Sequence, residues 1–297
     1  MNNIRVISKN ISQNNPEFIY ISLDTIEGSS CVGHWLWECA LFLPYIVQLQ
    51  KDCKIPFKIL LHEKKIYKSN ILSDFGFHEC DILYSTNMVK DPDGTGVWQE
   101  KVVYPDENSE YILFLPTFMY LWQTKFDNKS LIKLFFSSLN QFRMHYINNI
   151  QNIEKTIPIT YVARSKVENY KNNSRNFINV DAFCNLLDNN MVNILYTDTL
   201  QSFNPQFNTI IKSKVLIVEM GSAFTINAAF IAMDSHIIVI NDFYDYYTAD
   251  ENFFHIFRFL MQDRNNTVEI FSTGSYRDDF SVDIDAFKRR IDELLTK

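Results

Sequence analysis

The fold of this chain is indicated most clearly by one stretch, Val215-Leu216-Ile217-Val218-Glu219-Met220-Gly221-Ser222-Ala223. It begins with four apolar residues in a row, three of them β-branched, which is typical of a strand buried on both faces of a parallel sheet. The glycine and serine that follow are typical of a tight turn and of a helix N-cap. The stretch therefore predicts a strand, a turn and a helix in succession.

Strand and helix patterns alternate on both sides of this stretch, with short connections between them. We expect strands at 157–163, 192–196, 215–219 and 236–240. Helical spacing is found at 180–187, 204–212 and 223–233. Further helical patterns at 251–261 and 282–295 flank a strand pattern at 268–272. This alternation predicts βαβ units and a parallel sheet, and so an α/β fold.

The N-terminal half shows less regular patterns. We expect strands at 4–8, 17–22, 57–62 and 81–85, and helices at 35–50, 64–75 and 131–150. Pro44 lies inside the first helical pattern and should kink or interrupt it. Residues 88–105 carry turn signals and are expected to form a loop.

The change in regularity predicts two domains, 1–155 and 156–297. The last helix is a candidate to pack back on the N-terminal domain. The formal net charge of −7 argues against a general nucleic-acid partner.

The five cysteines include no C-x-x-C pair, which favours thiols in a reducing compartment. No apolar run approaches the ~18 residues of a membrane span. The N-terminus lacks the apolar segment of a signal peptide. We therefore expect a cytoplasmic protein without a transmembrane segment, whose contact with a membrane would be peripheral.

Ligands of open parallel sheets bind beyond the carboxyl ends of the strands. Gly221 would let a ligand approach the backbone closely, and the N–H groups of Gly221, Ser222 and Ala223 would face an anion. This pattern favours a diphosphate site. An ordinary strand-to-helix turn with a serine cap is the alternative.

Two arginines lie in the first connection of the C-terminal half. Arg164 follows the strand pattern at 157–163, and Arg175 and Asn176 come after an Asn-rich segment. Paired arginines can clamp a pyrophosphate through bidentate hydrogen bonds. A solvated basic loop is the alternative.

A third candidate is Gly33-His34-Trp35-Leu36-Trp37-Glu38, at the start of the first helical pattern. His34 and Glu38 are four residues apart and would share one face of a helix. A histidine beside a carboxylate can accept a proton near neutral pH. The alternative is a helix start whose aromatic rings belong to the core.

Metal chemistry has little support in the sequence. The spelling D-x-D occurs at Asp91-Pro92-Asp93 and at Asp283-Ile284-Asp285, but such pairs arise by chance, and the second resembles a helix start. His62 and His78 have no partners at metal-ligand spacing. We expect neither a metal nor a cofactor.

Taken in chain order, these motifs resemble glycosyltransferase family 61, a group of capsular polysaccharide and protein O-glycan transferases. The stretch from Gly33 to Glu38 resembles the family's aromatic-flanked histidine with its acidic residue. Arg164, Arg175 and Asn179 resemble its strand-terminal arginine, second arginine and asparagine.

The later motifs extend this resemblance. Gln206 resembles a glutamine that the family often carries in a short helix. Gly221-Ser222-Ala223, followed by Asn227 and Phe230, resembles the family's "H-G-(S/A)-x-x-x-N…F" turn and helix. Met220 replaces the frequent histidine there, and Asn227 comes about one residue later than usual.

The resemblance implies a GT-B fold, with two Rossmann-like domains and a cleft between them. It implies that the C-terminal domain binds the donor and that the N-terminal domain binds the acceptor. The implied reaction is inverting and metal-independent: a hexosyl or pentosyl group passes from a nucleoside diphosphate sugar, taken as UDP-linked, to a glycan hydroxyl.

The catalytic candidates are His34, as the base, and Glu38, which would orient it or act instead. The donor-binding candidates are Arg164, Arg175, Asn179, Gly221, Ser222, Ala223, Thr225 and Asn227. Two other functions stay open. One is a binding or scaffold protein with a degenerate transferase fold, and the other is a different GT-B-shaped enzyme, such as a sugar-nucleotide epimerase.

Overall fold

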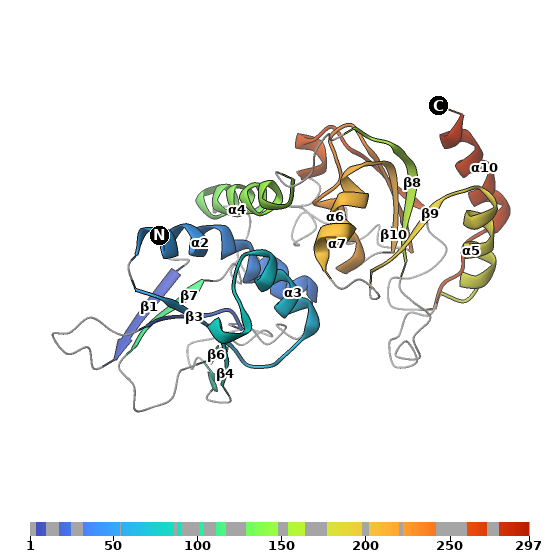
Figure 1. The fold of residues 1–297 in the computed structure, drawn as a ribbon. Helices are drawn as coiled ribbons and strands as arrows, with labels where there is room; N and C mark the ends of the chain where they lie inside the picture. The colour runs from blue at the N-terminus through green and yellow to red at the C-terminus, as the bar shows by residue number, and fades with distance from the viewer. Residues whose placement is uncertain are drawn as a thin grey trace. The chain divides into compact units, whose positions relative to one another are not determined.

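The computed structural model describes residues 4–9, 18–24, 32–53, 55–85, 88–90, 101–103, 111–116, 129–147, 154–163, 177–197, 202–219, 222–241, 260–271 and 279–296. The chain divides into two compact units, Met1–His145 and Tyr146–Lys297. The division falls near the end of helix α4 (Lys129–Ile147), before the boundary expected after residue 155. Each unit has its own five-stranded sheet (Figure 1).

The sheet of the N-terminal unit has the order β1-β7-β2-β3-β4. Its strands are β1 (Ile4–Lys9), β2 (Ile19–Ser22), β3 (Phe57–Leu61), β4 (Ile82–Tyr84) and β7 (Tyr111–Pro116). β1 is antiparallel to β7, and every other neighbouring pair is parallel. The chain builds outward from β2 to β4 and then returns to β2 on its other side with β7. The direction of sheet growth therefore reverses between β2 and β7.

The prediction of a loop over 88–105 is wrong near both ends, where the structure has short strands. β5 (Met88–Lys90) and β6 (Lys101–Val103) pair as an antiparallel ribbon. The turn residues lie between these short valine-containing segments, so they join two strands. The sequence patterns also left β7 unassigned. Its continuous apolar run carries no period that separates a strand from a buried helix.

The helical segments of the N-terminal unit before α4 are α1 (Val32–Glu38), η2 (Ala40–Phe42), α2 (Leu43–Asp52), α3 (Ile66–Asp74) and η3 (Glu79–Asp81). The helix expected over 35–50 is therefore interrupted after Glu38, and a new helix begins at Leu43, directly before Pro44. The interruption predicted from Pro44 is confirmed. Pro44 lies in the first turn of α2, where its missing N–H removes no helical hydrogen bond.

Aromatic contacts pack the part of α4 before Tyr146 against the other helices of the N-terminal unit. The ring centroids of Trp37 and Phe135 lie 5.8 Å apart, and those of Phe75 and Phe142 lie 5.0 Å apart. The Tyr45 hydroxyl is 3.0 Å from Ser137 Oγ. These contacts join α1, α2 and the end of α3 to α4.

The sheet of the C-terminal unit is parallel at every pairing, with the order β12-β11-β10-β8-β9. Its strands are β8 (Ile157–Ala163), β9 (Asn193–Tyr196), β10 (Ser213–Glu219), β11 (His236–Ile240) and β12 (Thr267–Phe271). The helices whose bounds are described in full are α5 (Val180–Asn189), α6 (Phe203–Ile211), α7 (Ser222–Ala228) and α10 (Ile284–Leu295). The strand, turn and helix predicted around Gly221 correspond to β10 and α7. The predicted α/β class with a parallel, Rossmann-like sheet is confirmed.

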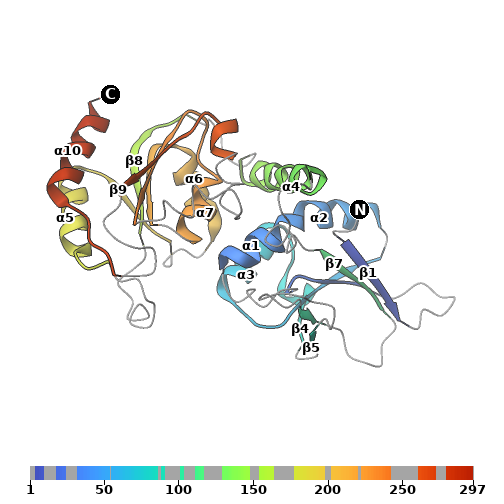
Figure 2. The same cartoon turned by 180° about the vertical axis from the view of Figure 1, so that it is seen from behind.

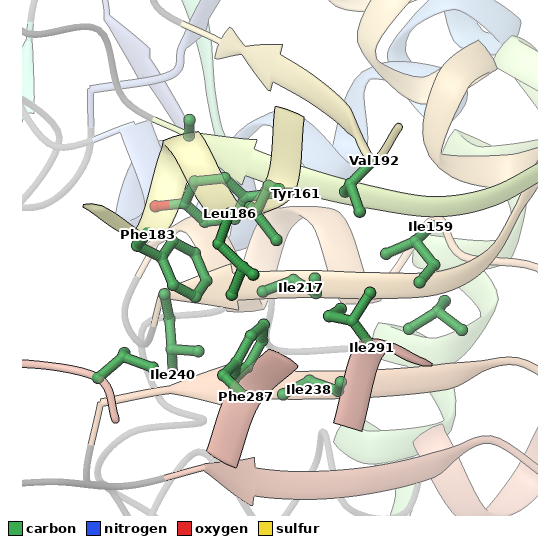
Figure 3. Close-up of a cluster of buried hydrophobic side chains, with 14 of the residues drawn as sticks. Ile159, Tyr161, Phe183, Leu186, Val192, Ile217, Ile238, Ile240, Phe287 and Ile291 are labelled. Carbon is green, nitrogen blue, oxygen red and sulfur yellow. The ribbon is translucent and has the colours of Figure 1, made fainter. Parts of the chain in front are cut away.

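Helices cover both faces of this second sheet. α5 and α10 lie on one face, and α6 and α7 lie on the other, in both views (Figures 1 and 2). Under α5 and α10, Ile217 and Ile238 of the sheet pack with Phe183, Phe287 and Ile291 in one buried cluster (Figure 3). The last helix therefore packs on the sheet of its own unit, although it was a candidate to pack on the N-terminal domain.

Candidate functional site

The carboxyl ends of β8 and β10 lie side by side in the second sheet. Val218 of β10 pairs with Val162 of β8. From β8 the chain passes through α5 to β9 at one edge, and it then returns through α6 to β10 on the other side of β8. The connections after β8 and β10 lead to helices on opposite faces. This is a topological switch point, where open parallel sheets bind their ligands.

The strongest donor candidates adjoin this switch point in sequence. Arg164 follows the last residue of β8, and Gly221 lies between β10 and α7. Arg164, Arg175 and Gly221 lie outside the described residues, and so does Met220. Ser222 and Ala223 are described only as the first residues of the α7 backbone. The roles of these residues as diphosphate ligands stay predictions.

A tyrosine and a carboxylate meet at the same strand ends. Glu219 is the last residue of β10. The Tyr161 hydroxyl on β8 donates a hydrogen bond to Glu219 Oε1 at 3.2 Å. The Tyr161 ring is 1% exposed and packs edge-on against Phe183, with centroids 5.2 Å apart. The core thus fixes the ring and its hydroxyl, and the hydroxyl orients a half-buried carboxylate at the switch point.

Two of the motif positions are hydrogen-bond partners. Gln206 Nε2 on α6 donates to Asn227 Oδ1 on α7 at 2.6 Å, and both side chains are buried. Thr225, another of the donor candidates on α7, is also buried. The amide pair joins α6 to α7, and the stacked rings of Phe207 and Phe230 are a second contact between the same two parts of the chain. Asn227 therefore has an internal role, and its contact with a donor stays a prediction.

Asn179 also has internal partners. It precedes α5, and its side chain forms two hydrogen bonds with the backbone of Val282, just before α10. Asn179 Nδ2 donates to the Val282 carbonyl at 2.7 Å, and the Val282 N–H donates to Asn179 Oδ1 at 3.0 Å. This asparagine joins the starts of α5 and α10. Its predicted donor contact is untested.

In the N-terminal unit, α1 follows the carboxyl end of β2, beside the reversal between β2 and β7. Trp35 and Trp37 on α1 are buried, as the alternative of core aromatics predicts. The side chains of His34 and Glu38 lie outside the described part of the structure. Their helix is placed where a ligand would bind, and their catalytic roles stay predictions.

A fully buried ion pair lies at the ends of β2 and β3. Lys68 Nζ donates to Asp24 Oδ1 at 2.7 Å, and neither side chain is exposed. The His62 N–H donates to Asp24 Oδ2 at 2.6 Å. Lys68 Nζ also lies 5.8 Å from the centroid of the Trp35 ring, within cation–π range. The pair therefore links two strand ends, α3 and α1.

Burial raises the pKa of the Asp24 carboxyl above its usual value. The charge and hydrogen bond of Lys68, together with the backbone N–H groups of His62 and Glu63, lower the pKa and offset part of this effect. The ammonium group is thus the main partner of a carboxylate that has been removed from water.

The sequence patterns missed all of these contacts. Lys68 could have been found, because it lies three and four residues before Ile71 and Leu72 and so falls on the apolar face of α3. Glu219 directly follows the apolar run at 215–218 and ends its strand, which is a weaker signal. Nothing in the local sequence pairs Gln206 with Asn227.

The described residues offer no group of three or more His, Cys, Asp or Glu side chains that could hold a metal ion. Asp283, in the second D-x-D spelling, caps α10 by accepting the Ala286 N–H at 3.0 Å, which confirms the predicted helix start. Asp91 and Asp93 lie outside the described residues. Within the described ranges, the helices all fall short of the length and apolarity needed to cross a membrane.

No match to this chain is found among curated proteins. The model of the family Glycosyltransferase 61 matches residues 32–239, from the start of α1 into β11. The match covers more than half of the 297 residues and includes every motif on which the resemblance was based. The chain belongs to the glycosyltransferase 61 family.

Proposed function

We propose that this protein transfers a sugar from a nucleoside diphosphate sugar, UDP-linked, to a hydroxyl of a glycan, with inversion and without a divalent metal. Membership of the family, which supports glycosyltransferase activity, carries the proposal. The switch point between β8 and β10 supports it independently, since sheets of this kind bind nucleotides there. The two units, each with a parallel-rich sheet, are consistent with a GT-B enzyme.

The donor diphosphate needs positive charge and N–H donors. In the proposal, Arg164 and Arg175 bind its oxygens, and the backbone N–H groups of Gly221, Ser222 and Ala223 complete the anion site. Without a metal, these groups stabilise the negative charge that develops on the leaving nucleoside diphosphate. Asn179, Thr225 or Asn227 would contact the ribose or the transferred sugar.

Inversion requires a single displacement. The acceptor oxygen attacks the anomeric carbon as the bond to the diphosphate breaks, and a base on the opposite side takes the hydroxyl proton. We assign this base to His34, with Glu38 orienting it or replacing it. The position of α1 after the carboxyl end of β2 supports the assignment.

We also propose that the transferase acts in the cytoplasm. No disulfide joins cysteines in the described part of the chain, and Cys39 is buried there. This pattern suits a reducing compartment.

The decisive experiment removes the arginines one at a time. Arg164→Ala and Arg175→Ala should each weaken UDP binding by roughly tenfold to a hundredfold, because each removes charge-assisted hydrogen bonds. Arg175→Ala should also abolish donor turnover and leave the Tm nearly unchanged. Calorimetric titration with UDP measures the affinity, and product analysis measures turnover.

Lys171→Ala is the matched control, because it removes one positive charge from the same connection. It should have the smaller effect. UDP binding that survives both arginine substitutions would refute the proposed clamp. A wild-type chain that binds no nucleoside diphosphate would favour the scaffold alternative.

A further inference from the structure

The Glu219 carboxylate has no assigned task in the proposed reaction, although it ends β10 at the switch point. It directly precedes Met220 and Gly221, so it adjoins the connection predicted to bind the diphosphate. A carboxylate repels the oxygens of a diphosphate, so a contact of Glu219 with a donor would be made to another part of the molecule. The question is which part of a donor a carboxylate can bind there.

The structure fixes the orientation of this carboxylate. Tyr161 and Glu219 lie on adjacent strands, and the Tyr161 hydroxyl donates to Glu219 Oε1 at 3.2 Å. In Figure 3 the hydroxyl oxygen of Tyr161 points toward the end of the sheet where Phe183 and Ile240 lie. This is the end at which β11 finishes with Ile240, and so it is the carboxyl end of the sheet. A buried ring therefore directs its hydroxyl, which is a hydrogen-bond partner of Glu219, toward the ligand-binding edge.

An ionised carboxylate accepts hydrogen bonds and donates none. It repels phosphate oxygens, which are also acceptors, and binds hydroxyl groups well. Nucleotides carry such groups on the ribose, and acidic side chains accept from ribose hydroxyls in other nucleotide-binding parallel sheets. The chemistry of Glu219 thus favours the neutral, hydroxyl-bearing part of the donor.

We propose that Glu219, oriented by Tyr161, accepts a hydrogen bond from a ribose hydroxyl of the donor nucleotide and so discriminates against nucleotides that lack this hydroxyl. The inference rests on the proposed function, because it assumes that a nucleoside diphosphate occupies this switch point. Tyr161 acts as a positioning residue, and Glu219 acts as a specificity residue.

The test compares UDP with its 2′-deoxy and 3′-deoxy forms by calorimetric titration of the full chain. The wild type should bind UDP roughly tenfold to a hundredfold more tightly than one of the deoxy forms, as expected for a hydrogen bond to a charged group. Glu219→Gln should weaken UDP binding by a similar factor and leave binding of that deoxy form nearly unchanged. Tyr161→Phe, which keeps the carboxylate but removes the hydrogen bond from the Tyr161 hydroxyl, should reduce the discrimination by a smaller factor.

Glu269→Gln is the matched control, since it makes the same charge change in the same unit, on β12. It should leave the discrimination unchanged. Equal weakening of UDP and both deoxy forms by Glu219→Gln, or no weakening of any, would overturn the inference. An effect seen with UDP-glucose but not with UDP would also overturn it, because the hydroxyl would then belong to the transferred sugar.

A failure of the proposed function gives a different result. In that case the wild-type chain would bind none of the nucleotides, and the variants would match it. If the wild type binds UDP but does not discriminate between UDP and its deoxy forms, the proposed donor class survives and the role of Glu219 does not.

Discussion

Each of the two sheets has a carboxylate at its carboxyl end, and the two carboxylates differ in burial and in their partners. In the N-terminal unit, Asp24 is fully buried and paired with the ammonium of Lys68. In the C-terminal unit, Glu219 is half-buried and accepts from the neutral hydroxyl of Tyr161. The ammonium of Lys68 offsets the charge of Asp24, whereas the Tyr161 hydroxyl helps to orient Glu219 and contributes no charge. Asp24 thus belongs to the buried structure of its unit, and Glu219 is the carboxylate to which we assign a ligand-binding role.

This difference suggests a division of labour within the proposed enzyme. Because the Asp24 carboxylate is enclosed, acid–base chemistry in the N-terminal unit has to come from other side chains, and His34 and Glu38 on α1 are the candidates. The ion pair still bears on α1, since Lys68 lies over the ring of Trp35. We therefore expect Asp24 and Lys68 to help position the helix and not to transfer protons.

Breaking the ion pair on one side should have the largest effect on stability. Lys68→Met leaves the buried Asp24 carboxylate without its counter-charge and should lower the free energy of unfolding by about 3–5 kcal/mol. Asp24→Asn/Lys68→Met, in which the amide oxygen can still accept the His62 N–H, should recover most of the loss. Urea denaturation followed by circular dichroism measures both. A loss of under about 1 kcal/mol in the single variant would mean that the pair is not a structural link.

The same variant has a defined pH dependence. The pKa of Asp24 is already raised by burial, and Lys68 is a major group that lowers it. Removing Lys68 should therefore raise the pKa further. A raised pKa in the folded state means that stability is greatest below the unfolded-state value, near 3.8, and is lost as the pH rises through the folded-state value. The deficit of Lys68→Met should thus be smaller at pH 5 than at pH 8.

The buried amide pair is the next test, because it separates structural from ligand-binding roles in the C-terminal unit. Gln206→Ala removes the hydrogen bond that Gln206 Nε2 donates to Asn227 Oδ1 and should lower the free energy of unfolding by about 1–3 kcal/mol. The affinity of the folded protein for UDP should stay the same, since Gln206 lies among the buried residues of α6. Asn227→Ala should give the same pair of results if its main partner is Gln206. If Asn227→Ala weakens UDP binding and Gln206→Ala does not, Asn227 contacts the nucleotide.

The C-terminal unit was predictable from sequence to a greater extent than the N-terminal unit. Local signals suffice in the C-terminal unit: apolar β-branched runs alternate with helical spacing, so β8 and β11 were predicted at their observed bounds. In the N-terminal unit, the strand β7 returns from far along the chain to lie between β1 and β2. Its place there depends on pairing with β1 and β2, which no local pattern encodes.

The candidate site was also predictable only in part. Its position at strand ends followed from the order of the elements, and the family resemblance was confirmed. The contacts of Tyr161, Asn179 and Gln206 join residues that lie 58, 103 and 21 positions from their partners. Such contacts depend on tertiary packing, so a single sequence gives only the residue types and not the pairs.

The smallest expected effect concerns an ion-pair network at the edge of the second sheet. Arg290 on α10 donates to Glu269 on β12 through Nη2 at 2.7 Å, and His236 Nε2 lies 2.9 Å from the same carboxylate oxygen. Burial raises the pKa of Glu269, but the hydrogen bonds and charges of Arg290 and His236 outweigh it and lower the pKa below 4.5. The stability from this carboxylate is therefore present above pH 4.5 and is lost as the pH falls through the lowered folded-state value.

Glu269→Gln should accordingly lower stability at pH 7 by up to about 1 kcal/mol, because the network is partly exposed and screened by solvent. The difference from the wild type should shrink as the pH falls below 4.5. Glu79→Gln is the control in the N-terminal unit, where Glu79 pairs with Lys64 and the two side chains are 75% and 64% exposed. It should produce the smaller change at every pH. Urea midpoints at pH 7 and pH 4 measure this, and equal changes in both variants would show that α10 gains nothing from its partly buried anchor.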